Sequence, residues 1–128
     1  MIAIIDYGAG NIFSVKNALD YLGVENKLTA DRNEICAADE IILPGVGAFP
    51  WAMKMLRDSG LVDTIREEAK KKPFLGICLG MQLIFDKGYE FEETDGLRLI
   101  GGKVEKIDRK DMIIPHMGWN ELEINRDC

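Results

Sequence analysis

The sequence predicts an α/β fold in which helices flank a doubly wound, mostly parallel sheet, and three observations lead to this prediction. Short continuous apolar runs, typical of strands buried on both faces, occur at Ile2–Ile5 and Glu40–Leu43. Segments with helical spacing of apolar residues separate such runs. Glycine-rich turns follow the runs, as at the carboxyl edge of such a sheet, where ligands bind. We therefore expect residues 1–128 to form one domain.

The composition restricts the classes of function that are open to the chain. Its 128 residues are 47% hydrophobic and 30% charged, which describes a globular protein with one core. A net charge of −6 argues against a nucleic-acid partner, and no apolar run is long enough to cross a membrane. Three widely spaced cysteines and one histidine argue against a disulfide framework and a metal site. We expect a cytoplasmic protein without a cofactor.

The first strand is followed by a glycine-rich turn, Tyr7–Asn11, and by a segment of helical spacing, Ile12–Leu22, that ends before Gly23. This order is also compatible with a dinucleotide site. However, Phe13 occupies the position where the third glycine of that motif is needed for close packing. A tight turn with Asn11 as helix cap is the better interpretation.

The loop after the third strand is the next candidate for function. A second strand is predicted at Val24–Leu28 and a short capped segment at Asp31–Cys36, before the third strand at Glu40–Leu43. That strand leads into Pro44–Pro50, which is rich in glycine and proline. Backbone N–H groups in such a loop can hold an anion or an oxyanion. An ordinary surface loop is an equally good interpretation from the sequence.

The remaining segments predict two helices and weaker strands. The helices are expected at Trp51–Arg57 and Leu61–Lys71, with Lys70–Lys72 as a solvated helix end. Glycines and acidic residues from Asp86 onward predict loops. Alternating patterns then predict half-exposed strands at Lys103–Ile107 and Glu121–Ile124.

A cysteine between two glycines, Gly76-Ile77-Cys78-Leu79-Gly80, has the spacing of a nucleophile elbow. An apolar run behind Pro73 predicts a strand before it, and Leu79–Phe85 can form a helix after it. The glycines leave room for a sharp turn that lifts the sulfur clear of the sheet. The alternative is a buried, unreactive cysteine. Because this elbow and the 44–50 loop both follow strands, the fold would bring them to the same edge.

Four motifs together extend this interpretation to a family. They are Asp6-Tyr7-Gly8-Ala9-Gly10-Asn11, Leu43-Pro44-Gly45-Val46-Gly47-Ala48-Phe49, Gly76-Ile77-Cys78-Leu79-Gly80-Met81-Gln82 and Pro115-His116-Met117-Gly118-Trp119-Asn120. In this order they resemble the glutaminase subunit of imidazole glycerol phosphate synthase, a class I, triad-type glutamine amidotransferase. The resemblance runs from Met1 to about Asn125.

The resemblance implies a role for each matching residue. Cys78 would attack the side-chain amide of L-glutamine and form a glutamyl thioester. The oxyanion hole would use the N–H of Leu79 and that of Val46 or Gly47. Gln82 and Gly45 would contact the substrate.

The resemblance also implies a partner, a TIM-barrel cyclase subunit that uses the released ammonia to make imidazole glycerol phosphate in histidine biosynthesis. Residues in the first and last motifs would lie at that interface or near the site: Asn11, His116, Gly118, Trp119 and Asn120. Loop packing, with Trp119 as a core anchor, is the alternative for these residues.

The chain departs from the family pattern in one respect. Family members carry a catalytic His-x-Glu pair in their final third, but here the histidine, His116, is followed by Met117 and Gly118. We therefore expect a C-terminally truncated, partial glutamine amidotransferase domain, weak or inactive alone and with an unpaired sheet edge. A non-catalytic remnant that binds the cyclase or self-associates is the alternative. Another cysteine-elbow α/β protein, of the hydrolase or chaperone kind, is a third.

Overall fold

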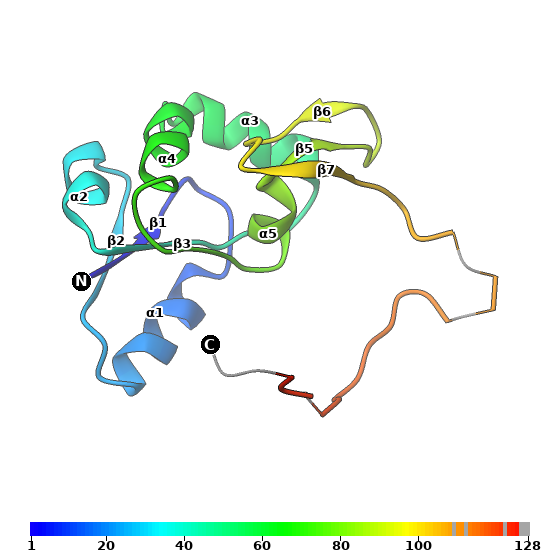
Figure 1. Cartoon of the computed structure of the whole chain (residues 1–128), viewed down its shortest axis with the longest axis horizontal. Coiled ribbons are helices and arrows are strands. Elements are labelled where there is room, and N and C mark those ends of the chain that lie inside the picture. The colour runs from blue at the N-terminus through cyan, green and yellow to red at the C-terminus, as the bar shows by residue number, and fades with distance from the viewer. Residues whose placement is uncertain (109, 112, 122, 126–128) are drawn as a thin grey trace.

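The computed structural model describes residues 1–108, 110–111, 113–121 and 123–125. It contains a four-stranded sheet with flanking helices and a smaller three-stranded sheet (Figure 1). No helix of the described residues is long and apolar enough to span a membrane. The elements, in chain order, are β1 (Ile2–Ile5), α1 (Ile12–Tyr21), β2 (Asn26–Thr29), α2 (Arg32–Ala37), β3 (Glu40–Leu43), α3 (Phe49–Asp58), α4 (Val62–Glu68), β4 (Phe74–Gly76), α5 (Leu79–Leu83), β5 (Phe85–Gly88), β6 (Thr94–Asp95) and β7 (Ile100–Val104).

The larger sheet has the strand order β2-β1-β3-β4, and all its strands are parallel. Ile4 in the central strand β1 is in register with Leu28 of β2 and with Ile42 of β3. Figure 1 shows α1 on one side of this sheet and α2, α3 and α4 on the other. The predicted parallel, doubly wound arrangement is therefore confirmed, because helices cover both faces.

The two faces of the sheet are covered unequally. Ile5, Ile41 and Leu43 point into the main core, where they pack with apolar residues of α2, α3, α4 and α5. The opposite face carries Ile4, which is fully buried, and Leu75 on the edge strand β4, which is 54% exposed. No residue of α1 is fully buried, since this helix covers only part of its face. Burial therefore stabilises mainly the side that faces α2–α5.

In the smaller sheet, the segment from Asp86 that contains most of β5 and all of β6 was predicted incorrectly as loops. The helix expected through Phe85 ends at Leu83, and Phe85–Gly88 forms β5, the central strand of the order β6-β5-β7. Its sequence, Phe-Asp-Lys-Gly, has low strand propensity. Pairing with β6 and β7, which follow it along the chain, stabilises this strand instead.

The last predicted strands also differ from the structure. β7 begins at Ile100 and ends at Val104, so it starts three residues before the strand predicted at Lys103–Ile107. Gly101 and Gly102 lie inside this strand, and they interrupt the alternation of apolar and polar residues from which a strand is predicted. Of the strand predicted at Glu121–Ile124, Leu122 lies outside the described residues, and the other three have no strand conformation.

The lysine run after α4 corrects another prediction, because the side chain of Lys72 is largely covered by protein and is only 11% exposed. Its Nζ donates to the carbonyl oxygens of Cys36 and Ala38, each at 2.8 Å, at the end of α2. The same Nζ lies 2.8 Å from Oε2 of Glu68, and Lys71 lies 2.7 Å from Oε1. Lys72 thus neutralises the negative end of α2 and joins α2 to α4. These two lysines lower the pKa of Glu68 to about 2, and the hydrogen bond from Lys71 is the largest single cause.

We predict that Glu68→Gln makes the free energy of unfolding less dependent on pH between about 4.5 and 2. The folded-state pKa of Glu68 is depressed from 4.5 to about 2, so its stabilisation is complete above pH 4.5 and is lost as the pH falls to 2. Urea unfolding of wild type and variant at several pH values measures this difference. Glu67→Gln, a change at the exposed neighbour, is the control and should leave the wild-type profile intact. Equal slopes for wild type and Glu68→Gln would contradict the prediction.

Candidate functional site

Cys78 occupies a strained turn between β4 and α5. Its backbone angles are φ 55° and ψ −116°, a conformation that residues other than glycine rarely adopt. Such a conformation costs about 1–3 kcal/mol and persists only where the surrounding structure imposes it. The Cys78 side chain is exposed, so the alternative of a buried core cysteine is wrong. The turn therefore presents a thiol to solvent at the end of a strand.

The two glycines of the elbow allow the backbone to approach very closely. A Cβ atom at position 76 would lie 2.6 Å from Cα of Met81, and one at position 80 would overlap the carbonyl oxygen of Leu43. The first turn of α5 is thus packed against β4 and against the end of β3. Glycine therefore occurs at both positions of the elbow because a larger side chain would collide with the neighbouring backbone.

A cavity of about 570 Å³ opens beside Cys78. It brings together four of the residues that the sequence singled out, and six that it did not. The four are Gly47, Cys78, Leu79 and Gln82, and the others are Tyr89, Glu90, Phe91, Val104, Glu105 and Lys106. The carboxyl ends of β3 and β4 therefore meet at one site, as their parallel arrangement requires.

The loop after β3, residues 44–47, has a buried part and an open part. Pro44 and Gly45 are buried, and a Cβ on Gly45 would lie 2.7 Å from N of Gly80. Gly47 has φ +97°, which favours glycine, and a Cβ there would meet no atom within 4 Å. Gly45 therefore acts as a spacer against α5 and does not line the cavity. Val46 does not line the cavity either, and its side chain is 55% exposed.

Backbone donors near this cavity lack partners within the described residues. Within the described residues, no hydrogen bond is made by the N–H of Val46 or of Gly47. Leu79 is the first residue of α5, and the first N–H groups of a helix have no partner within the helix. Unpaired donors beside a nucleophile are the elements of an oxyanion site.

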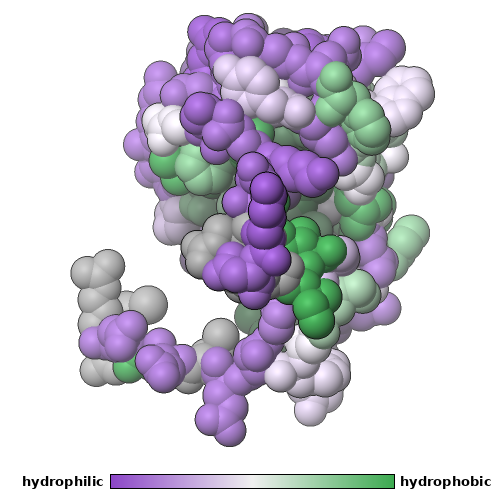
Figure 2. Space-filling view, turned by 90° about the vertical axis from the view of Figure 1, so that its right-hand side faces the viewer, coloured by the Kyte–Doolittle hydropathy of each residue, from purple (hydrophilic) through white to green (hydrophobic). Residues whose placement is uncertain are grey.

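The structure does not bring the residues of the predicted interface to the cavity. Asn11 caps α1 by accepting a hydrogen bond from the N–H of Ser14 at 3.4 Å. His116 and Asn120 contact each other, with 2.9 Å between Nε2 and Nδ2, and Trp119 is fully exposed. The core-anchor interpretation of Trp119 is therefore wrong. Gly118 is exposed as well. Figure 2, which views the side with the smaller sheet, shows the C-terminal segment standing away from the body.

Glu90 is the most informative residue that the sequence reasoning missed. It follows β5, and its Oε2 accepts a hydrogen bond from the N–H of Phe49 at 2.8 Å, which joins the smaller sheet to α3. Phe49 in turn packs on Gly88, where a Cβ would lie 2.6 Å from the ring. A charged residue among several acids carries no signal of its own in a sequence. Recognising it would have required knowing that residues 85–88 form a strand.

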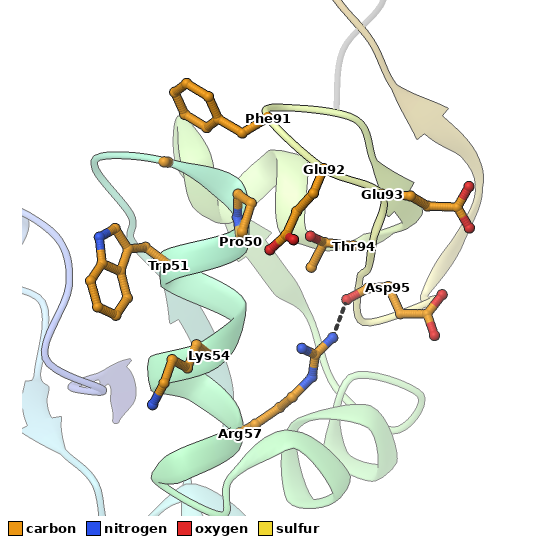
Figure 3. A pocket seen from close by; sticks show the side chains of 10 residues that line it. Pro50, Trp51, Lys54, Arg57, Phe91, Glu92, Glu93, Thr94 and Asp95 are labelled. Atoms are coloured by element: carbon orange, nitrogen blue, oxygen red, sulfur yellow. Dashed lines mark hydrogen bonds between the residues drawn. The ribbon is translucent and has the colours of Figure 1, made fainter.

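A second cavity, of about 890 Å³, lies on the far side of the loop that carries Phe91 (Figure 3). Its walls mix Trp51, Lys54 and Arg57 of α3 with acidic residues of the 91–95 segment. Lys54 pairs with Asp58, and Arg57 donates to the carbonyl oxygen of Asp95 at 2.7 Å. Cys78 does not line this cavity. We therefore assign the chemistry to the smaller one, because it contains the nucleophile and the unpaired donors.

Comparison with known proteins adds independent information about the chain. A family profile described as glutamine amidotransferase class-I matches residues 3–127. An imidazole glycerol phosphate synthase subunit HisH from Listeria monocytogenes serotype 4a (strain HCC23) is 52% identical, over 98% of this chain and 62% of the relative. A protein of the same description from Bacillus cereus (strain G9842) is also 52% identical, over 99% of this chain and 61% of the relative. The chain thus spans less than two thirds of these relatives.

Solved structures agree with the fold. A crystal structure of glutamine amidotransferase has a TM-score of 0.63 at 22% identity, over 76% of this chain and 52% of that one. A putative peptidase E protein from Listeria monocytogenes EGD-e has a TM-score of 0.62 at 18% identity, over 77% and 62% of the two chains. At these identities the likeness concerns the fold alone.

We predict that Gly80→Ala destabilises the protein by about 3 kcal/mol, at the upper end of the usual cost of overpacking, because its Cβ would overlap the Leu43 carbonyl. Thermal and urea unfolding measure the change. Gly101→Ala is the matched control, since its Cβ would meet only Oδ2 of Asp86 at 3.9 Å, and it should change stability by about 0.5 kcal/mol or less. Similar stabilities for the two variants would show that the close approach is not essential.

Proposed function

The chain belongs to the class-I glutamine amidotransferase family, and from this membership we propose that it carries the thioester-forming site of a glutaminase. In this proposal Cys78 takes the γ-glutamyl group of L-glutamine and releases ammonia. The observation that carries it is the strained, exposed Cys78 beside a cavity that also contains Gly47, Leu79 and Gln82. A strained nucleophile with unpaired N–H donors next to it suits acyl transfer.

The proposed reaction begins with attack of the Cys78 sulfur on the amide carbon of glutamine. A sulfur–carbon bond forms, and the carbonyl oxygen becomes an oxyanion. The carbon–nitrogen bond then breaks, and the nitrogen leaves as ammonia after taking up a proton. Water hydrolyses the resulting thioester to glutamate and restores the thiol.

The oxyanion would be stabilised by backbone donors from two loops. Leu79, directly after the nucleophile, supplies the N–H of α5, and Val46 or Gly47 supplies the other. Removal of one donor of this kind lowers the turnover rate by about 10²–10³-fold, because such donors are fixed in place before the reaction begins. Gly47 lines the cavity and Val46 does not, which favours a donor at the Val46–Gly47 peptide.

The charges of the cavity suit a free amino acid. We assign Gln82 to the substrate amide and Glu90 to the α-ammonium group, because Glu90 is a carboxylate on the cavity wall. Lys106, on the same wall, provides a cation for the α-carboxylate. Glutamine carries both charges and an uncharged side-chain amide, so its length would place that amide toward Cys78 while its charged end contacts the β5 and β7 side.

Transfer of a proton to the leaving nitrogen needs an acid–base group that does not line this cavity. In the described part of the chain no histidine lines the cavity, and His116 is exposed and hydrogen-bonded to Asn120. In acyl-transfer triads the loss of the base costs about 10⁴–10⁶ in turnover. Formation of the thioester is therefore the step that this chain's own residues support best.

We further propose that the ammonia passes to a cyclase subunit in a cytoplasmic heterodimer. The two relatives above are described as subunits of imidazole glycerol phosphate synthase, and the word subunit implies a partner. The segment after β7 exposes apolar side chains that a partner could cover: Ile107, Ile113, Met117, Trp119 and Ile124. The same exposure supports the second candidate, a non-catalytic chain that binds the cyclase or itself.

We predict that Cys78→Ala abolishes glutamate release from glutamine by the chain mixed with the cyclase subunit and its nucleotide ligand. The variant loses the nucleophile but keeps every exposed apolar side chain, so binding to the cyclase, measured by calorimetry, should persist. Cys36→Ala, at the second cysteine that is exposed in the described part of the chain, is the control. Binding without any Cys78-dependent turnover or acylation would favour the non-catalytic candidate.

We predict that Glu90→Gln raises the half-saturating concentration of L-γ-glutamyl-p-nitroanilide about tenfold or more in acylation of Cys78, because an ion pair is lost. This probe releases p-nitroaniline, which is less basic than ammonia and depends less on a general acid. Absorbance and intact mass follow the reaction. Glu92→Gln, on the wall of the other cavity, should keep the wild-type concentration dependence. An unchanged value for Glu90→Gln would remove it from the substrate site.

A further inference from the structure

We propose that Tyr7 is a positioning residue that holds the 44–47 loop in the orientation needed for oxyanion binding, an inference that rests on the proposed function. Tyr7 lies in the turn that follows β1 and does not line the cavity that contains Cys78. Its effect would pass through the backbone of the loop.

The Tyr7 hydroxyl makes a buried hydrogen bond to the loop. It donates to the carbonyl oxygen of Pro44 at 3.0 Å, and the residue is 5% exposed. Burial raises the pKa of Tyr7 to about 12, so the phenol keeps its proton and remains a donor throughout the working range of an enzyme. Because a peptide unit is planar, fixing the Pro44 carbonyl also fixes the direction of the Gly45 N–H.

Three contacts hold the peptide between Pro44 and Gly45 from different sides. A Cβ on Gly45 would lie 3.0 Å from the Tyr7 hydroxyl and 2.7 Å from N of Gly80, so this glycine lies between the phenol and α5. On another side, a Cβ on Gly10 would lie 3.4 Å from N of Gly45. The turn after β1 thus braces the turn after β3.

The next peptide of the loop has no such support. The N–H groups of Val46 and Gly47 are unpaired among the described residues, and the space around Gly47 is open. The direction of these donors is therefore set by the anchored peptide before them and by the start of α3 at Phe49 after them. Loss of the Tyr7 hydrogen bond would leave the Pro44 carbonyl buried without a partner and favour reorientation of the peptide.

Tyr7→Phe tests this inference, since it removes one hydroxyl and keeps the ring. We expect acylation of Cys78 by L-γ-glutamyl-p-nitroanilide to slow about tenfold, because oxyanion donors are misdirected. In this step the sulfur–carbon bond forms, and p-nitroaniline leaves with a proton from solvent. Alkylation of Cys78 by iodoacetamide forms no oxyanion, so its rate should stay the same. Tyr21→Phe, at an exposed tyrosine of α1, should match wild type in both reactions.

The two rates distinguish the possible outcomes. Slower acylation with unchanged alkylation supports the positioning role, whereas a general structural defect would change both. Equal acylation by wild type and Tyr7→Phe would overturn the inference and leave the proposed function intact. Absence of acylation at Cys78 in the wild-type chain would overturn the proposed function and the inference with it.

A second measurement does not depend on activity. The amide resonances of Gly45 and Gly47 should shift and broaden in Tyr7→Phe, because the loop samples more than one orientation. Superimposable glycine resonances in wild type and variant would contradict the proposed positioning role.

Discussion

The backbone of the elbow lies directly against the end of β3, and the geometry of the site follows from this contact. A side chain at position 80 would overlap the Leu43 carbonyl, and one at position 76 would collide with Met81. Both positions therefore need glycine, and the chain between them has to pass through the strained conformation of Cys78. The packing of three backbone segments thus imposes the strain, and the strain holds the sulfur at the surface.

Strand order explains why three loops meet at this point. β1, β3 and β4 are neighbours in the sheet and run in the same direction, so their carboxyl ends lie side by side. The turn after β1 supports the loop after β3, and that loop lies on the helix after β4. Each layer fixes the next through hydrogen bonds or glycine contacts that leave no space for a Cβ. An open α/β sheet commonly forms its site at this edge.

Much of this arrangement could be predicted from local sequence. The buried strands, the first helices and the elbow are signalled by apolar runs and by glycines at fixed spacing, because each depends on residues close in the chain. β5, Lys72 and Glu90 could not be predicted in the same way. β5 exists because β6 and β7 pair with it, Lys72 is held by the carbonyl oxygens at the end of α2, and Glu90 is positioned by its hydrogen bond from Phe49. The partners of Lys72 and Glu90 are distant in sequence, and the low strand propensity of β5 gives no signal of its pairing, so local patterns carry no trace of these contacts.

The positions of the two tryptophans have a consequence for optical measurements. Trp51 is 66% exposed and Trp119 is fully exposed, so both indoles are already in water in the folded chain. Their fluorescence would emit at the long wavelengths usual for unfolded proteins and change little on denaturation. A shift to shorter wavelength would instead report that a surface has covered one of them. Tryptophan fluorescence of this protein is thus a poor signal for folding and a direct signal for association.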